Sequence, residues 1–290
     1  DDMLADPSFP KDISFFKIDV EGFECEVLKG GGSFLKTVHP QFVKTEIWTG
    51  DSLIGCTREN YMDLYKQSGY EVYTSKSCSG GHGSPSDTDF YMCRQPGHQG
   101  MSVLQSKTEA SSIAGTVGLN TKTELEACQL PEFGQWCQVR PSVGSPYQMA
   151  VFAGKDIVSD SICESGKWEI SEVQSYGAVG NALDVGGNMG YFTFMLANAG
   201  WNVQTFEPLP TNIALFNATM CANPQFGSRV TLHEHALGSH ADTCMSYSDD
   251  SNQGDGIVRC GADQQKPIPA GYSKRGDFPV KRLDDMLADP

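Results

Sequence analysis

Apolar and polar residues follow two spacings along the chain, one typical of strands and one typical of helices. Short apolar runs predict strands, and runs with a period near 3.6 residues predict helices between them. The predicted strands are 13–20, 42–48, 71–74, 90–93, 182–185, 203–206 and 230–235, and the predicted helices are 23–29, 57–68, 121–129, 191–198 and 211–222. Strands and helices in alternation favour an α/β fold, with helices flanking a mostly parallel central sheet.

The segment 96–155 interrupts this alternation. Turn-forming residues gather at 95–100 and 140–146, with a stretch rich in Ser, Thr and Gly between them. Only 121–129 has the spacing of a helix, and Thr121 with Glu124 matches a capping box. We therefore predict three parts: a first half at 1–95, a linker with one short helix at 96–155, and a second half at 156–290.

The same seven residues, Asp-Asp-Met-Leu-Ala-Asp-Pro, stand at 1–7 and at 284–290. A copy at so long a spacing indicates one unit of a head-to-tail array of whole domains. In such an array Pro290 is the natural neighbour of Ser8, so the folded module runs through 156–290 and then 8–95. The sequence thus predicts a circularly permuted fold. An isolated unit either closes on itself as a monomer or exchanges halves in a domain-swapped dimer.

Composition limits the classes of partner. The chain has 290 residues, 39% of them apolar, and a net charge of −15. It contains no run of about 18 apolar residues that would predict a membrane helix, and no signal segment at its start. Nucleic-acid binders neutralise phosphates with clustered Lys and Arg, so the negative charge disfavours nucleic acid. We expect a cytoplasmic protein without a membrane partner, with targeting signals upstream of Asp1 left open.

Ten cysteines are scattered through the chain, at 25, 56, 78, 93, 128, 137, 163, 221, 244 and 260. No Cys-x-x-Cys pair indicates a zinc ribbon or a thioredoxin-like site. We expect reduced and mostly buried thiols, with a Cys128–Cys137 disulfide as the alternative. Three histidines, His233, His235 and His240, lack an acidic ligand in a suitable pattern, so we expect no metal site.

The strongest chemical signal follows the predicted strand at 182–185. Asp184 stands near the end of this strand, and a glycine-rich turn at 186–190 leads into the next helix. Glu207 closes the following strand, where an acid can accept hydrogen bonds from both hydroxyls of a ribose. A glycine-rich turn alone is a weak signal, but together with these two acids it predicts a nucleoside-cofactor site.

Asp184 distinguishes two classes of cofactor. A dinucleotide would bring a pyrophosphate to this turn, and a carboxylate there would repel it. S-adenosylmethionine has no phosphate, and its amino group and sulfonium are cationic. The turn therefore favours S-adenosylmethionine over a nicotinamide dinucleotide.

Several segments resemble the FkbM family of S-adenosylmethionine-dependent methyltransferases. They are 184–193, 206–208, 235–238, the Lys-Ile-Asp-Val-Glu-Gly-Phe-Glu block at 17–24 and its continuation to 30, and the lead-in segment 160–169. The resemblance implies a Rossmann-like methyltransferase fold and transfer of a methyl group to a hydroxyl of a sugar, polyketide or similar small acceptor. In the family the Asp-Val-Glu-Gly block follows the glycine-rich block, whereas here it precedes it.

The resemblance also implies roles for individual residues. The residues expected to bind the methionine end of the cofactor are Asp184, Gly186, Asn188, Gly190, Tyr191 and Thr193, with Trp168 and Glu169 as further candidates. Glu207 is expected to bind the ribose, with Pro208 and Asn212 beside it. His235 and Ala236 are expected to contact the adenine.

Asp19 and Glu21 follow the first predicted strand, whose carboxyl end should face the sulfonium. We expect Asp19 mainly to position the cofactor, and Glu21 to contact the acceptor or to take the proton of its hydroxyl as a base. Two alternatives stay open: Glu21 caps the helix at 23–29, or alignment of the reactants makes a base dispensable. Glu46 is a weaker candidate on the acceptor side.

Two other functions stay open. The first is a non-catalytic repeat module that keeps the fold for scaffolding, which the acids at the predicted site disfavour. The second is a nicotinamide-dependent oxidoreductase, which Asp184 disfavours. No motif identifies the acceptor, and we expect the segment 243–281 to build its pocket.

Overall fold

The computed structural model describes residues 9–46, 53–74, 78, 89–94, 122–168, 176, 178–249 and 252–287. The strands are β1 (Ile13–Ile18), β2 (Phe42–Glu46), β3 (Tyr70–Tyr73), β4 (Asp89–Arg94), β5 (Gly134–Val139), β6 (Tyr147–Phe152), β7 (Asn181–Val185), β8 (Asn202–Phe206), β9 (Val230–His233), β10 (Ala236–Leu237), β11 (Asp242–Asp249), β12 (Asn252–Cys260) and β13 (Tyr272–Lys281). The helices are α1 (Glu24–Gly30), α2 (Gly32–Thr37), α3 (Arg58–Gln67), α4 (Lys122–Ala127), α5 (Ile157–Ser165), α6 (Tyr191–Asn198) and α7 (Pro210–Ala222), with short 3-10 helices at Pro224–Phe226, Gly261–Gln265 and Asp284–Met286.

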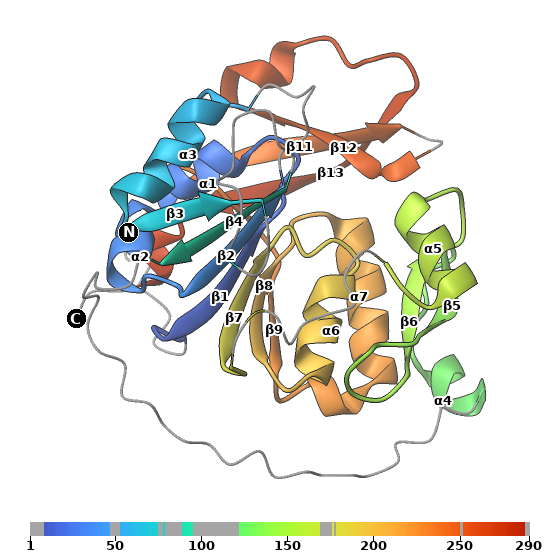
Figure 1. Ribbon diagram of the computed structural model, residues 1–290. Coiled ribbons are helices and arrows are strands. Elements are labelled where there is room, and N and C mark those ends of the chain that lie inside the picture. Colours follow the sequence, from blue (N-terminus) through green and yellow to red (C-terminus); the bar gives the residue numbers. More distant parts are fainter. Residues whose placement is uncertain are drawn as a thin grey trace.

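A seven-stranded sheet forms the centre of the molecule, in the order β3-β4-β2-β1-β7-β8-β9 (Figure 1). The five strands from β2 to β9 in this order run parallel, and β4 runs antiparallel between β2 and β3. β1 and β7 are neighbours in the middle of the sheet, and the Ser14 hydroxyl donates to the carbonyl of Asn181, 167 residues away, at 3.2 Å. The amino-terminal and carboxy-terminal parts of this chain therefore complete one sheet.

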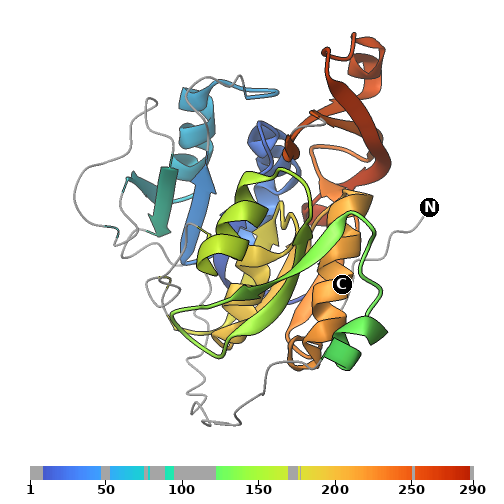
Figure 2. The same cartoon turned by 90° about the vertical axis from the view of Figure 1, so that its right-hand side faces the viewer.

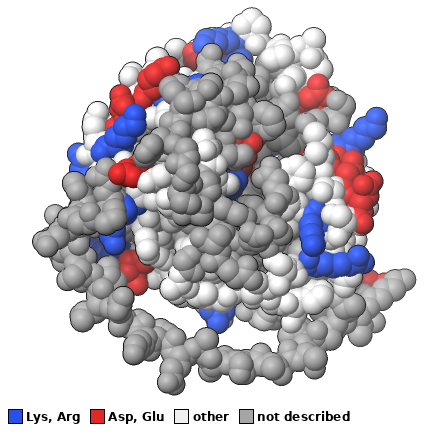
Figure 3. Space-filling model, viewed as in Figure 1, with Lys and Arg blue, Asp and Glu red and all other residues white. Residues whose placement is uncertain are grey.

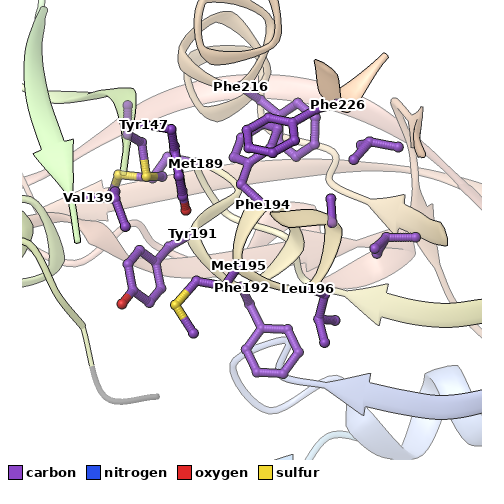
Figure 4. Packing of buried hydrophobic residues seen from close by; sticks show 14 of the residues in the cluster. Val139, Tyr147, Met189, Tyr191, Phe192, Phe194, Met195, Leu196, Phe216 and Phe226 are labelled. Atoms are coloured by element: carbon purple, nitrogen blue, oxygen red, sulfur yellow. The ribbon is translucent and has the colours of Figure 1, made fainter. Parts of the chain in front are cut away.

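Both faces of this sheet are covered, which explains the nearly continuous apolar runs of its strands. On β1, Phe15 points into one hydrophobic cluster and Phe16 into the other, because successive side chains of a strand face opposite sides. Figure 4 shows part of the first cluster, where the rings of Phe194 and Phe226 stack with their centres 5.3 Å apart. Seven of the eight residues of α6 are buried, as expected for a helix that is apolar on all sides.

The prediction of a linker over 96–155 is wrong for residues 134–152. They form an antiparallel hairpin, β5–β6, which lies against α7 on the outside of the sheet (Figure 2). The hairpin buries Val139, Tyr147 and Met149 in the first cluster, and the turn-forming residues at 140–146 are its loop. The helix expected at 121–129 is α4, and Thr121 of its capping box lies outside the described residues.

Where another strand or helix was predicted, its boundaries agree with the structure to within two residues among the described residues, whereas α2, α5 and β10 to β13 were not predicted. The strand expected at 230–235 ends at His233, where the His235 N–H donates to the His233 carbonyl in a tight turn. The chain then changes direction and β10 pairs with β13 instead. β10, β13, β11 and β12 form a second sheet beside the carboxyl edge of the first, and it includes most of the described residues of the segment 243–281 (Figures 1 and 2).

All ten cysteines are paired, which corrects the expectation of reduced thiols. The disulfides are Cys25–Cys56, Cys78–Cys93, Cys128–Cys221, Cys137–Cys163 and Cys244–Cys260. The alternative Cys128–Cys137 pair is also wrong, because Cys128 is bonded to Cys221 of α7 and Cys137 of β5 is bonded to Cys163 of α5. Disulfides persist in oxidising compartments, so this pairing weighs against a cytoplasmic location. Among the described residues, no helix has both the length and the apolar character needed to cross a membrane.

The segment after β13 is anchored to the first half. The Asp284 carboxylate accepts hydrogen bonds from the Ser33 N–H at 3.0 Å and the Phe34 N–H at 2.9 Å, at the start of α2. Leu283 is 1% exposed and belongs to the second hydrophobic cluster. Residues 284–287 are the described part of the repeated heptapeptide. The first of them, Asp284, therefore contacts α2 of the first half.

Candidate functional site

A cavity of about 400 Å³ lies at the carboxyl ends of β1, β7 and β8, between this edge of the central sheet and the second sheet. β7, β8 and β9 succeed one another toward one side of the sheet, and β1 and β2 toward the other. The crevice beside such a reversal of strand order is where parallel α/β sheets bind their ligands.

Most of the residues that sequence reasoning singled out line this cavity. They are Asp19, Glu21, Trp168, Gly186, Asn188, Tyr191, Glu207, Pro208, Asn212 and Ala236. Those outside its lining are Glu46, Asp184, Gly190, Thr193 and His235. Glu169 lies outside the described residues.

Asp184 lies beneath the cavity and not on its surface. Its side chain is fully buried, and its Oδ2 accepts a hydrogen bond from the Thr193 hydroxyl at 2.6 Å. Its Oδ1 lies 3.4 Å from the ammonium of Lys17. Burial raises the pKa of Asp184 above its ordinary value, although Lys17 and Thr193 act in the opposite direction. The sequence predicts that Asp184 meets the amino group of the cofactor directly or through a water, and its full burial offers no direct contact.

Lys17 is the central residue that sequence reasoning missed. Its Nζ donates to the Gly186 carbonyl at 3.1 Å and lies 3.4 Å from a carboxylate oxygen of both Asp19 and Asp184. Burial alone would lower its pKa, but Asp184 and Asp19 hold it above the ordinary value for lysine. The available signal was a lysine inside a buried strand, two residues before Asp19 and so on the same face.

Backbone contacts also join the two loops that Lys17 connects. The Asp19 N–H donates to the Val185 carbonyl at 3.0 Å. Gly186 has φ of 83°, and a Cβ on it would run into the Asp19 carbonyl oxygen. Only glycine therefore allows the loop after β1 to pass this close to the turn after β7.

Glu207 joins this turn to the end of β8. Its Oε2 accepts from the Asn188 N–H at 2.8 Å, and its Oε1 accepts from the Leu209 N–H at 2.9 Å and the Asn212 amide at 3.1 Å. Burial raises the pKa of Glu207 to about 7 in spite of these hydrogen bonds. Each carboxylate oxygen has two lone pairs and those of Oε1 are both used, so Oε2 can accept one further hydrogen bond from a ligand in the cavity.

Glu24 supports the loop that carries Asp19 and Glu21. It is 1% exposed, and its Oε1 accepts from the Val20 N–H at 3.1 Å and the Gly22 N–H at 3.3 Å. Burial raises the pKa of Glu24 to about 7. The N-cap residue of α1 is Phe23, whose side chain makes no capping hydrogen bond, and it is Glu24 that binds the backbone of the turn before it. The exposed Glu21 has φ of 51° and faces the cavity.

The three histidines have separate surroundings. His233 stacks on Phe206 and its Nε2 lies 2.8 Å from the Gln204 Oε1. His235 is buried edge-on against Phe206, and burial lowers its pKa to about 3. His240 is exposed, with its Nδ1 3.0 Å from the Ser239 hydroxyl. Within the described part of the chain, the group with metal-ligand spacing is Asp242, Cys244 and Cys260, whose two sulfurs form a disulfide.

Carboxylates dominate the charge of the cavity. Six of them line it, at Asp19, Glu21, Glu26, Glu207, Asp242 and Asp263, against Lys17, Lys44 and His240. On the face shown in Figure 3, the described Lys and Arg side chains are scattered among Asp and Glu. This distribution suits a neutral or cationic ligand better than a phosphorylated one.

Comparison with known proteins gives a match to one family model. No curated protein and no solved structure matches the chain. Residues 1–66 match the family model of the methyltransferase FkbM domain. The matched range contains β1, α1, β2 and the loop with Asp19 and Glu21, but not the glycine-rich turn at 186–190. The amino-terminal part of the chain is therefore similar to an FkbM methyltransferase domain, which supports a methyltransferase.

Proposed function

We propose that the protein is an S-adenosylmethionine-dependent methyltransferase that methylates a hydroxyl of a small acceptor. The observation that carries the proposal is the meeting of two acidic loops at one cavity. The loop after β1, which lies in the range matched by the FkbM model, is joined by Lys17 to the glycine-rich turn after β7.

The residues present fit this cofactor. Lys17 is neutralised by Asp19 and Asp184, so the floor of the cavity has a net negative charge that favours a sulfonium and an ammonium over a pyrophosphate. Asp184 thus acts through the charge of the cluster rather than by touching the ligand. The backbone at 186–190 and Tyr191 would hold the methionine end, Glu207 the ribose, and Ala236 one side of the adenine.

The bound cofactor would supply an electrophilic methyl group. The chain's own contribution is to align the acceptor and remove its proton. Asp19, fixed by Lys17, would orient the reacting ends, and Glu21 at the cavity surface would accept the proton of the acceptor hydroxyl. Alignment supplies part of the rate without any base, so a Glu21→Gln variant is expected to slow transfer and not to abolish it.

The side chains that the second sheet contributes to the cavity indicate the chemical character of the acceptor. Its contribution to the cavity wall includes the apolar side chains of Ile257, Val258, Phe278 and Val280 as well as Asp242, while Asp19, Glu21 and Glu207 lie on the side of the central sheet. A hydroxyl on a compound with an apolar body and no phosphate suits these walls best.

Strand order supports a Rossmann-like fold with permuted halves. Counting from β7, the strands β7, β8, β9, β1 and β2 become 1 to 5 and stand in the order 3-2-1-4-5 of a doubly wound sheet. β5–β6 and α5 pack on the second half and therefore belong to the folded module. The bounds of the module then become 122–290 followed by 8–94. We propose that the chain is one unit of an array of such modules. A rearranged chain with Pro290 joined to Ser8 should then fold with the same melting temperature and ligand affinity, and an unfolded product would contradict the permutation.

Calorimetric titration with S-adenosylhomocysteine and with NAD tests the cofactor. We expect S-adenosylhomocysteine to bind more tightly, and Glu207→Gln to weaken it by about 10- to 100-fold, as for a lost charged hydrogen bond. The affinity of the wild type should rise with pH through about 7, because ionised Glu207 is the better acceptor. Asp63→Asn, in an exposed pair with Lys66, is the control. The assignment would be refuted if Glu207→Gln bound S-adenosylhomocysteine as tightly as the wild type does, or if the wild type bound NAD more tightly than S-adenosylhomocysteine.

Transfer of a labelled methyl group then separates an enzyme from a scaffold. The panel should contain neutral alcohols with apolar bodies, free sugars and phosphorylated alcohols. We expect transfer to the first group. Binding of S-adenosylhomocysteine without transfer to any compound would favour the scaffolding alternative.

A further inference from the structure

One exposed asparagine lies in an acceptor sequence for N-linked glycans. Asn217, Ala218 and Thr219 form Asn-x-Thr without proline in the middle, the sequence that oligosaccharide transfer requires. No other Asn-x-Ser or Asn-x-Thr occurs in the 290 residues. The three residues lie in α7, and the Asn217 side chain points to solvent while Ala218 and Thr219 are buried.

The disulfides supply an independent observation on the compartment. All ten cysteines are paired, and one of them, Cys221, stands four residues after Asn217 on the same helix, bonded to Cys128. Five disulfides form and persist where thiols are oxidised, as in the secretory lumen, and glycans are attached to asparagine in that same lumen. We propose that this chain matures in an oxidising secretory compartment and carries an N-linked oligosaccharide on Asn217.

The fold gives Thr219 a structural role that does not depend on glycosylation. It gives no such role to the side chain of Asn217. Thr219 is fully buried, and its hydroxyl accepts a hydrogen bond from the Ala150 N–H of β6 at 2.9 Å. Among the described residues no hydrogen bond of the Asn217 side chain is found, and the side chain borders a shallow depression formed with Pro210, Ile213 and Ala214. An attached oligosaccharide would therefore leave α7 and its packing unchanged.

The burial of Thr219 determines when the modification takes place. The transferase must reach the threonine hydroxyl of the acceptor sequence, and in the folded chain β6 covers it. The Nδ2 of Asn217 forms a bond to the anomeric carbon of a diphosphate-linked oligosaccharide donor; the bond from that carbon to the diphosphate breaks, the lipid diphosphate leaves, and the amide releases one proton. This step must precede the packing of α7 against β6.

Asn217 is not among the residues that line the main cavity. The oligosaccharide would stand outside the candidate cofactor site, so ligand binding is expected to be unchanged by it. The proposal does not depend on the proposed methyltransferase activity.

The test expresses the full chain behind a cleavable leader in a eukaryotic secretory host. Peptide mapping and digestion with an N-glycosidase should find one glycan, at Asn217, on a chain without free thiols. Asn217→Gln should lose the glycan and still form five disulfides. Thr219→Ser, which keeps both the acceptor sequence and a hydroxyl for the Ala150 N–H, should remain glycosylated, and Asn202→Gln, at an exposed asparagine outside any acceptor sequence, is the matched control.

Two results would overturn the proposal: an unmodified Asn217 on wild-type chains whose disulfides have formed, or free thiols on glycosylated chains. A second experiment checks the order of events. Folded, oxidised chain without glycan, made in a bacterial periplasm, is incubated with the transferase and its lipid-linked donor. We expect no modification until the chain is unfolded, and modification of the folded chain would contradict the argument from Thr219.

Discussion

The Lys17 ammonium lies between the carboxylates of Asp19 and Asp184, and replacing Lys17 by methionine removes its positive charge while keeping most of the side chain's volume. Asp184, fully buried, would lose its ionic partner and keep only the Thr193 hydroxyl. The Gly186 carbonyl would also lose its hydrogen bond from Nζ. We expect Lys17→Met to loosen the contact between the loops after β1 and β7.

The magnitude follows mainly from Asp184. Removing one partner of a buried ion pair destabilises a protein by about 3–5 kcal/mol, because a buried charge remains. The Asp19 side chain is 34% exposed, so solvent screens its share, which adds less than about 1 kcal/mol. Without Lys17, Asp184 in the folded variant holds a proton to higher pH than in the unfolded chain, where its pKa is about 3.9. The folded state then binds more protons, so the variant loses stability as pH rises above about 4.

Denaturant unfolding at pH 5 and pH 8, with the disulfides intact, measures both effects. The loss in Lys17→Met should approach 3–5 kcal/mol at about pH 8 and be smaller at pH 5. The double variant Lys17→Met/Asp184→Asn removes the orphan charge and should recover about 1–3 kcal/mol. Lys66→Met, at an exposed pair with Asp63, is the control and should cost at most about 1 kcal/mol. A loss below about 1 kcal/mol at pH 8, or no recovery in the double variant, would refute the reasoning.

Three further substitutions test the surroundings of the site. Gly186→Ala places a Cβ against the Asp19 carbonyl at a positive φ, so it should lower the melting temperature and weaken S-adenosylhomocysteine at least about tenfold by calorimetry; wild-type values for both would contradict the close docking of the loops. Glu24, whose pKa is raised from 4.5 to about 7, keeps a proton in the folded state that the unfolded chain has lost, so it should contribute a fall in wild-type stability of about 3 kcal/mol between pH 4.5 and 7, beside a similar contribution from Glu207. Glu24→Gln should flatten this dependence in unfolding curves, and an unchanged slope would contradict the shift. Replacing Cys128 and Cys221 by serine opens a loop of 93 residues and should cost about 4–5 kcal/mol in the chain-entropy model; a smaller loss than for the 16-residue loop between β11 and β12 would contradict it.

The sequence predicted the central sheet well because its strands are buried on both faces and its helices have clear ends. The helix at 191–198 agrees with α6 at both ends. The hairpin at 134–152 was missed because Gly, Pro and Ser at its loop resemble a linker, while its strands are short and contain the polar residues Gln135, Gln138 and Gln148. Packing against α7 stabilises these strands, and such packing cannot be deduced from local pattern.

The sequence could predict that most of the candidate residues lie at one cavity, but not which contacts they make there. Asp184 and Glu207 were both selected as acids at strand ends, yet the structure buries Asp184 beneath the cavity and leaves Glu207 on its wall. The difference arises from Lys17 on the neighbouring strand, whose register with Asp184 depends on pairing of β1 with β7. Most disulfides were missed for the same reason, since they join residues that the tertiary fold brings together, whereas Cys244 and Cys260 face each other across the β11–β12 hairpin, whose strands were not predicted.

The positions of the disulfides bear on whether the halves associate within one chain. Two disulfides lie within 8–94 and three within 122–287, so none joins the halves. The halves are held by the β1–β7 ladder, Lys17 and the Asp284 carboxylate on α2, all of them non-covalent. A self-closed monomer and a domain-swapped dimer would contain the same contacts, so effective concentration decides between them and favours the monomer in dilute solution. Sedimentation should find monomers after refolding at low concentration and a growing share of dimers after refolding at high concentration. Because exchange must break the centre of a seven-stranded sheet, the two species should interconvert slowly in native buffer. A dimer that forms at every concentration would contradict closure within one chain.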